Sequence, residues 1–190
     1  MVYDLSSLKD FIPFGSAILG AATGGFITYN LSKATQRRSV EQKRIESIFE
    51  LKSQVFRFGK RSFDFKCQFE DYIKEEHYFD MEKIFGLKDE LKNYFTAIMV
   101  GDWINYYSYA IHINSDVFKR TRDTHKQLLS ILQPIDFEYG NTDMEDVKCF
   151  YTKIKSAIDE IYKIVIEFHA FLETMGELYV ESYIEKYVGN

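Results

Sequence analysis

The chain has 190 residues, of which 46% are hydrophobic, 17% aromatic and 28% charged, and its formal net charge at pH 7 is −5. A composition this rich in Phe and Tyr excludes a disordered chain, and the length suits one domain with a sizeable core. The two prolines and ten glycines interrupt it rarely, which favours long helices. Its cysteines, Cys67 and Cys149, stand far apart in no metal spacing, and if the domain that holds them faces the cytoplasm we expect reduced thiols.

The first notable feature along the chain is an uncharged segment of 21 residues at positions 11–31, FIPFGSAILGAATGGFITYNL. A helix of this length spans about 30 Å, the thickness of the hydrocarbon core of a bilayer. We therefore predict a single transmembrane anchor, preceded by a short extracytoplasmic N-terminus at residues 1–10. A secretory signal peptide and a buried core helix are the alternatives, and the acidic residues Asp4 and Asp10 disfavour the signal peptide.

Small residues form one face of this predicted anchor, because they recur at a spacing of four. Small side chains let two helix backbones approach closely in lipid, and a Gly-x-x-x-Gly pair has the form of such a packing site. We therefore expect the chain to form a homo-oligomer through helix–helix packing of its anchor. The packing face comprises Ser16, Ala17, Gly20, Ala21, Gly24 and Gly25.

A basic stretch follows the anchor directly. Residues 31–61 hold nine basic and three acidic residues, whereas residues 62–190 hold 14 basic and 24 acidic ones. Positive charge beside a membrane span stays on the cytoplasmic side, so we predict a cytoplasmic C-terminal domain. The economy of the chain suggests a plasma (inner) membrane protein of a bacterium or phage. Basic residues near the membrane surface attract anionic lipid headgroups. This contact is expected for Lys33, Arg37, Arg38, Lys43 and Arg44.

We predict that the first part of the cytoplasmic region, residues 32–61, forms a basic juxtamembrane helix with a bend at Gly59. Residues 62–69, SFDFKCQF, alternate like a strand, but no second strand-like run could pair with them, so a helix is predicted there too. Apolar residues recur at helical spacing along the juxtamembrane helix. They are Val40, Ile45, Ile48, Phe49, Leu51, Val55 and Phe56.

We predict that residues 62–190 form an acidic helical-bundle domain. The whole cytoplasmic part is predicted to be an all-α bundle of four or five helices. Asn114 is expected to cap a helix that ends before Pro134. Thr142, with Glu145 three residues later, is expected to begin a long helix that continues beyond Gly176. An apolar stripe on one side of a helix before residue 114 includes Trp103, Tyr106, Tyr107, Ala110 and Ile111.

One short motif suggests enzyme chemistry. Arg120-Thr-Arg-Asp-Thr-His125, on a predicted helix of an all-α protein, resembles the motif of HEPN ribonucleases. In that family the Arg and His act on the RNA 2′-OH and the scissile phosphate, usually across a dimer. The resemblance implies Arg120 and His125 as catalytic candidates. The simpler interpretation, which we favour, is a solvated helix face.

The other candidate ligands do not form a metal motif. His112 with Asp116, and His169 with Glu173, each place two groups on one helix face, whereas a metal site needs three or four. We therefore predict no metal and no cofactor. The many Tyr residues suit core packing or a protein-binding surface, and their acidic surroundings speak against nucleic acid as a partner.

The sequence thus predicts a non-enzymatic, membrane-tethered interaction or effector module. It would self-associate through its anchor, lie against a bilayer with anionic headgroups and bind a cytoplasmic protein that the sequence does not identify. A membrane-anchored HEPN-like ribonuclease is the first alternative. A small pore-forming or membrane-perturbing toxin, in which the glycine-rich span lines a channel, is the second.

Overall fold

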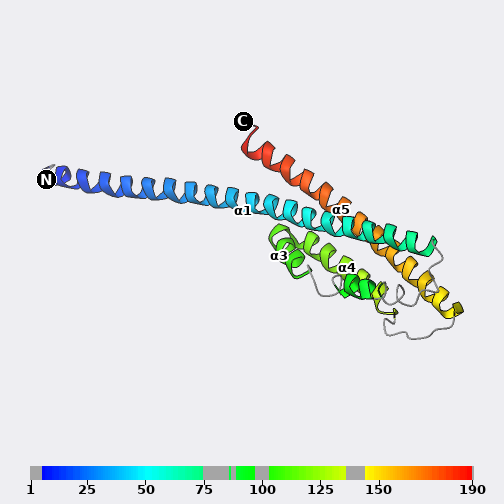
Figure 1. Ribbon diagram of the computed structural model, residues 1–190. Helices are drawn as coiled ribbons and strands as arrows, with labels where there is room; N and C mark the ends of the chain where they lie inside the picture. The colour runs from blue at the N-terminus through cyan, green and yellow to red at the C-terminus, as the bar shows by residue number, and fades with distance from the viewer. Residues whose placement is uncertain (1–5, 75–85, 87–88, 97–102, 136–143, 190) are drawn as a thin grey trace. The chain divides into compact units, whose positions relative to one another are not determined.

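The computed structural model describes residues 6–74, 86, 89–96, 103–135 and 144–189 (Figure 1). Within these ranges the regular secondary structure is helical, so the predicted all-α class is confirmed. Residues 62–69 are part of a helix, as predicted, and residues 89–96 are helical as well. The named helices are α1 (Ser6–Lys74), α3 (Trp103–Ile113), α4 (Ser115–Leu132) and α5 (Met144–Tyr187).

The chain divides into two compact units, Met1–Gln42 and Lys43–Asn190. In the first unit, side chains are described at residue 21 and from residue 23 onward, and those up to residue 40 are exposed. Among the residues whose side chains the structure describes, no helix is long and apolar enough to cross a membrane. The transmembrane anchor predicted at residues 11–31 is therefore not confirmed.

The second unit is a helical bundle whose core follows a seven-residue repeat. Core residues are spaced alternately by three and four, as in bundles whose helices wind gently around one another. On α1 they are Ile48, Leu51, Val55, Phe58, Ser62, Phe65 and Phe69. On α5 they are Tyr151, Ile154, Ile158, Ile161, Val165, Phe168 and Leu172.

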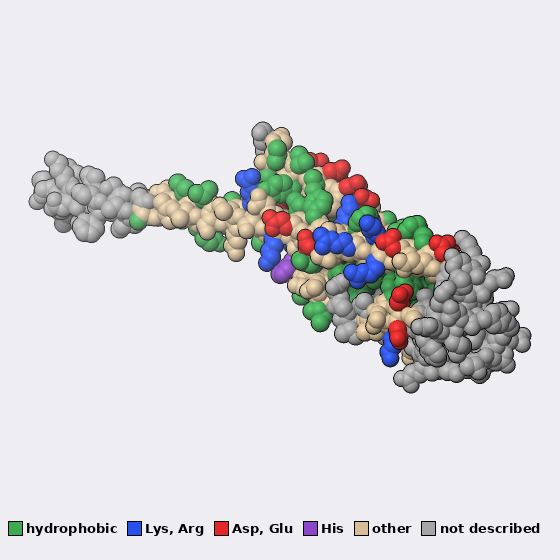
Figure 2. Space-filling model, viewed as in Figure 1, with side chains coloured by type: hydrophobic (Ala, Val, Ile, Leu, Met, Phe, Trp, Pro, Cys, Tyr) green, Lys and Arg blue, Asp and Glu red, His purple; other side chains and the backbone are tan. Residues whose placement is uncertain are grey.

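Helices α1 and α5 pack antiparallel along this repeat. Each step forward along α1 is matched by an equal step backward along α5, so the register does not slip. We call the part of α1 that belongs to the second unit, from Lys43 to Lys74, the bundle part of α1. In Figure 2, basic side chains lie over this part and acidic side chains lie along α5. Four side-chain pairs mark the register: Lys52–Glu173, Phe56–His169, Phe63–Tyr162 and Lys66–Asp159.

The predicted bend at Gly59 is wrong, because α1 is helical through this residue. Gly59 is buried, and a Cβ atom added to it would lie 3.4 Å from Cγ1 of Val165. A Cβ atom there would make an ordinary van der Waals contact, so Gly59 lies within the α1–α5 packing interface and does not mark a change of direction. The apolar stripe predicted along α1 was also too wide, because Val40, Phe49 and Phe56 are exposed.

The helix boundaries predicted around α4 are confirmed. The side chain of Asn114 accepts a hydrogen bond of 2.7 Å from the backbone N–H of Val117, which caps α4. This helix ends at Leu132, before Pro134, and α5 continues through Gly176. The cap predicted at Thr142 lies outside the described residues.

On α3 the core includes Ile113, whereas Ile111 is exposed, contrary to the prediction.

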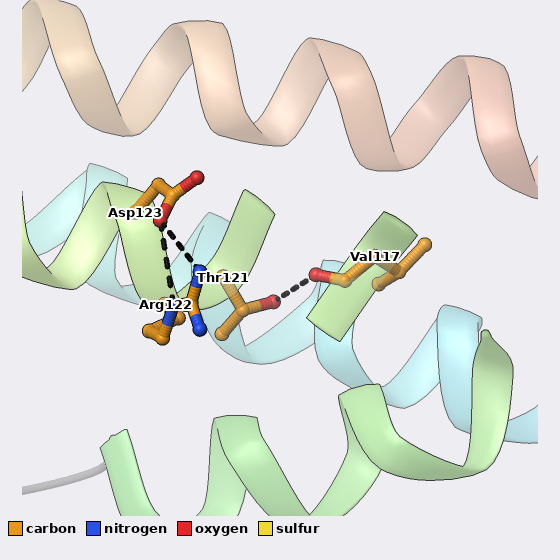
Figure 3. A network of polar contacts seen from close by, with 4 residues as sticks. All are labelled: Val117, Thr121, Arg122 and Asp123. Carbon is orange, nitrogen blue, oxygen red and sulfur yellow. Dashed lines mark hydrogen bonds and ion pairs between the residues drawn. The ribbon is translucent and has the colours of Figure 1, made fainter. Parts of the chain in front are cut away.

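Two buried threonines occupy core positions of α4, and they differ in hydrogen bonding. The hydroxyl of Thr121 donates to the backbone oxygen of Val117 at 2.8 Å (Figure 3). The hydroxyl of Thr124 is buried and has no hydrogen-bond partner among the described residues. A buried polar group without a partner destabilises a fold by about 1–3 kcal/mol.

We therefore expect Thr124→Val to raise the free energy of unfolding by about 1–2 kcal/mol, because valine has a similar shape and no hydroxyl to desolvate. Thr121→Val is the matched control and should change stability little, since it removes a hydroxyl that is already bonded. Urea unfolding followed by circular dichroism measures both. A lower midpoint for Thr124→Val than for the unmodified chain would contradict the prediction.

Candidate functional site

His125 packs against two aromatic side chains of α3. Its ring stacks on that of Trp103, with 4.5 Å between ring centroids and 5° between ring planes. The hydroxyl of Tyr107 lies 2.8 Å from Nδ1 of His125. Desolvation raises the pKa of Tyr107, against a smaller opposite effect of Arg122, so the hydroxyl keeps its proton. Which of the two groups donates in this hydrogen bond depends on the tautomer of His125. His125 is therefore a packing contact between α3 and α4, and the predicted solvated face is wrong for this residue.

Arg120 does not join His125 in a common site within the chain. Five residues along a helix correspond to a rotation of about 140°, so the two side chains leave α4 in different directions. Nε of Arg120 is buried and has no hydrogen-bond partner among the described residues. Its neighbour Arg122 forms an exposed ion pair of 3.4 Å with Asp123 (Figure 3). Phosphoryl chemistry would need the Arg and the His at one phosphate, an arrangement that α4 alone does not provide.

We expect Arg120→Ala and His125→Phe to leave function unchanged. Phenylalanine keeps the stack on Trp103, whereas His125→Ala should lower stability by about 1 kcal/mol because the aromatic contact is lost. An RNA cleavage assay, with melting followed by circular dichroism, separates activity from folding. If Arg120→Ala and His125→Phe both abolished a measured cleavage without changing the melting temperature, the ribonuclease interpretation would prevail.

The two predicted ligand pairs do not extend to a metal site in the part of the chain that the structure describes. There, no group of three or more His, Cys, Asp or Glu side chains could hold a metal ion. Glu173 instead forms an ion pair of 2.7 Å with Lys52, which lowers the pKa of the carboxyl. The ring of His169 lies 5.7 Å from that of Phe56, and desolvation lowers its pKa, partly opposed by the nearby Glu173.

An exposed row of phenylalanines lies on the bundle part of α1. Phe49, Phe56 and Phe63 are 49%, 59% and 48% exposed, and their spacing of seven residues places them on one side of the helix. Phe49 and Phe56 were predicted to belong to the buried stripe, so this surface was not predicted from the sequence. Each of the three phenylalanines directly follows a core position, Ile48, Val55 or Ser62, and only the placement of α5 shows which of the two neighbouring rows is buried.

Helix α5 completes this surface beside the phenylalanine row. The ring of Phe63 lies 5.7 Å from that of Tyr162, and Ile166 is exposed. Ion pairs flank the rings, including a 2.7 Å bond from Lys66 to Asp159 that raises the pKa of the lysine. We call this surface the outer α1/α5 face. It consists of Phe49, Phe56, Phe63, Tyr162, Ile166 and His169.

A groove of about 280 Å³ opens between α1 and α5 at the Phe49 end of this face. Its lining combines apolar side chains with a charged rim in which glutamates outnumber lysines. The apolar lining comes from Ile48, Phe49, Leu172, Gly176 and Val180, and the charged rim from Lys52, Glu173, Glu177 and Glu181.

The predicted anchor face is only partly described. Ala21, Gly24 and Gly25 are exposed, and a Cβ atom added to either glycine would meet nothing within 4 Å. Ser16, Ala17 and Gly20 lie on α1, but their side chains are outside the description. Of the predicted headgroup contacts, Lys33, Arg37, Arg38 and Lys43 are exposed and Arg44 is half-buried.

The arrangement therefore offers packing and docking surfaces, while the two residues of the enzyme motif point apart on one helix. Comparisons of the chain with protein-family models, with curated proteins and with solved structures found no match.

Proposed function

We propose that the protein is a non-enzymatic helical interaction module held at a membrane by residues 11–31. The observation that carries this proposal is the apolar surface of the first unit, where Phe26, Ile27 and Leu31 are 66%, 63% and 67% exposed. Exposing apolar surface to water costs about 25 cal/mol per Å², so burying this surface against another apolar phase is favourable. An uncharged helical segment of 21 residues has the length and composition that lipid would cover.

The charges that follow this segment support one orientation. Lys33 and Arg37 are exposed on α1, and each basic residue near an anionic membrane surface contributes about 1 kcal/mol of attraction. Basic residues beside a span favour the cytoplasmic side, so the bundle would lie in the cytoplasm. There its outer surfaces would bind protein partners, and the small face of the anchor would pair copies of the chain.

We expect the full protein to sediment with membranes and to resist extraction by alkaline carbonate, because an apolar span is held by the bilayer and not by surface charge. Ile18→Arg with Ile27→Arg should release it, since a charge within the bilayer core costs about 2.5–3.5 kcal/mol per residue on insertion scales. The matched control, Ile18→Val with Ile27→Val, should stay in the pellet. Recovery of the unmodified protein in the soluble fraction without detergent would refute the membrane proposal.

A further inference from the structure

We propose that two copies of this chain pack together through the outer α1/α5 face, with the bundle part of α1 in each copy lying antiparallel on α5 of the other. This interface goes beyond the proposed function, which assigns self-association to residues 11–31. It uses different residues, all of them in the second unit.

The apolar part of the face has the pattern that a partner helix recognises. Phe49 and Phe63 are 14 residues apart, which corresponds to about 21 Å along a helix, with Phe56 midway. A row repeating every seven residues stays on one side of a gently wound helix, so a second helix can follow it over its whole length. Aromatic residues are also enriched at protein interfaces, because they bury a large area at small entropic cost.

The opposite net charges of α1 and α5, counted around each whole helix, favour a second copy as the partner. Residues 43–66 of α1 carry seven basic and three acidic residues, whereas residues 159–185 of α5 carry seven acidic and one basic residue. Figure 2 shows basic side chains over α1 and acidic side chains along α5. Within the chain the Lys52–Glu173 and Lys66–Asp159 pairs already exploit this complementarity. A second copy can repeat it across the interface.

Symmetry then selects the arrangement. A two-fold axis parallel to the helices places α1 of each copy over α5 of the other, so basic helices meet acidic ones twice. A two-fold axis across the helices would place α1 over α1 and bring like charges together. The parallel axis also directs residue 43 of both copies toward the same end of the dimer. The acidic rim of the groove, with Glu177 and Glu181, then has room for basic side chains of the second copy.

The test is the mass of the full chain in mild detergent, measured by sedimentation velocity over a range of concentrations. To separate this interface from the anchor, the measurements use a Gly24→Ile background, which is designed to disable anchor pairing. We expect a dimer in this background, and a dissociation constant raised at least about tenfold by Phe56→Glu. Phe56 is 59% exposed, so the charge reaches water in the monomer and the fold should persist. The matched control Ile104→Glu, at a 75% exposed position of α3, should not weaken the dimer.

A monomer in the Gly24→Ile background, or equal dissociation constants for Phe56→Glu and Ile104→Glu, would overturn the proposal and assign the face to another partner. A second measurement covers the case that Phe56→Glu fails to fold. Two differently tagged chains, both lacking Cys67 and Cys149, carry Phe56→Cys and Ala170→Cys respectively. Mild oxidation should join the two tags in one disulfide-linked dimer, while Ile111→Cys in place of Phe56→Cys should not. Absence of the mixed disulfide would refute the α1-on-α5 arrangement.

Discussion

Replacing Phe168 with alanine is expected to lower the free energy of unfolding of the bundle by about 3–5 kcal/mol. Phe168 is 1% exposed and occupies a core position in the seven-residue repeat of α5. Its removal takes away a large apolar side chain and leaves a cavity that rigid neighbouring helices fill only in part. Domains of this size are stable by about 5–15 kcal/mol, so this one change removes a large share of the total.

Urea unfolding followed by the helical circular dichroism signal measures this effect. The matched control is Leu178→Ala on the same helix, where the leucine is 54% exposed and a change within about 1 kcal/mol is expected. Similar midpoints for Phe168→Ala and Leu178→Ala would contradict the assignment of Phe168 to the core and, with it, the α5 repeat.

Replacing Gly24 with isoleucine is expected to abolish pairing of the predicted anchor. In lipid, apolar surface gains nothing by leaving its solvent, so close backbone packing must supply the attraction, and only small side chains allow that approach. A Cβ atom at Gly24 or Gly25 would meet nothing within 4 Å in the chain itself. A loss of pairing would therefore report on contact with another molecule and not on damage to the helix.

A membrane dimerisation reporter fused to residues 8–33 provides the measurement. The signal of Gly24→Ile should fall to background, while Phe26→Leu, a change between large apolar residues at an exposed position, should keep it. Equal signals at matched expression would show that the small face does not pair with itself. The face would then pack on a different membrane protein or lie outside the bilayer.

The sequence predicted the bundle well where its signals are local. The cap at Asn114 and the end of α4 before Pro134 each depend on a residue type with a strong local preference. The course of α5 through Gly176 depends instead on its apolar repeat. A repeat sustained over many turns, as on α5, identifies both the helix and its buried side.

The sequence could not predict features that depend on a distant helix. Phe49 and Ile48 are adjacent and both apolar, and only the position of α5 decides that Ile48 is buried and Phe49 exposed. Gly59 looked like a bend because glycine is unfavourable inside helices, and only the placement of α5 shows that it is a buried position of a continuous helix, next to Val165. His125 has polar neighbours along the chain, so its stacking on Trp103 could not be seen before α3 and α4 were placed together.

The pairing of α1 with α5 also has a consequence for the newly made chain. Lys52 and Glu173 are 121 residues apart, so the apolar stripe of α1 leaves the ribosome long before its main partner helix exists. At a synthesis rate of about 5–20 residues per second, that delay is on the order of ten seconds. During this time Ile48, Leu51 and Val55 have no α5 to cover them. Neighbouring nascent chains on one messenger RNA then expose the same apolar surface and can associate through it. Slower translation of the region between the two helices should therefore lower the yield of folded protein, whereas a chaperone that holds apolar helices should raise it.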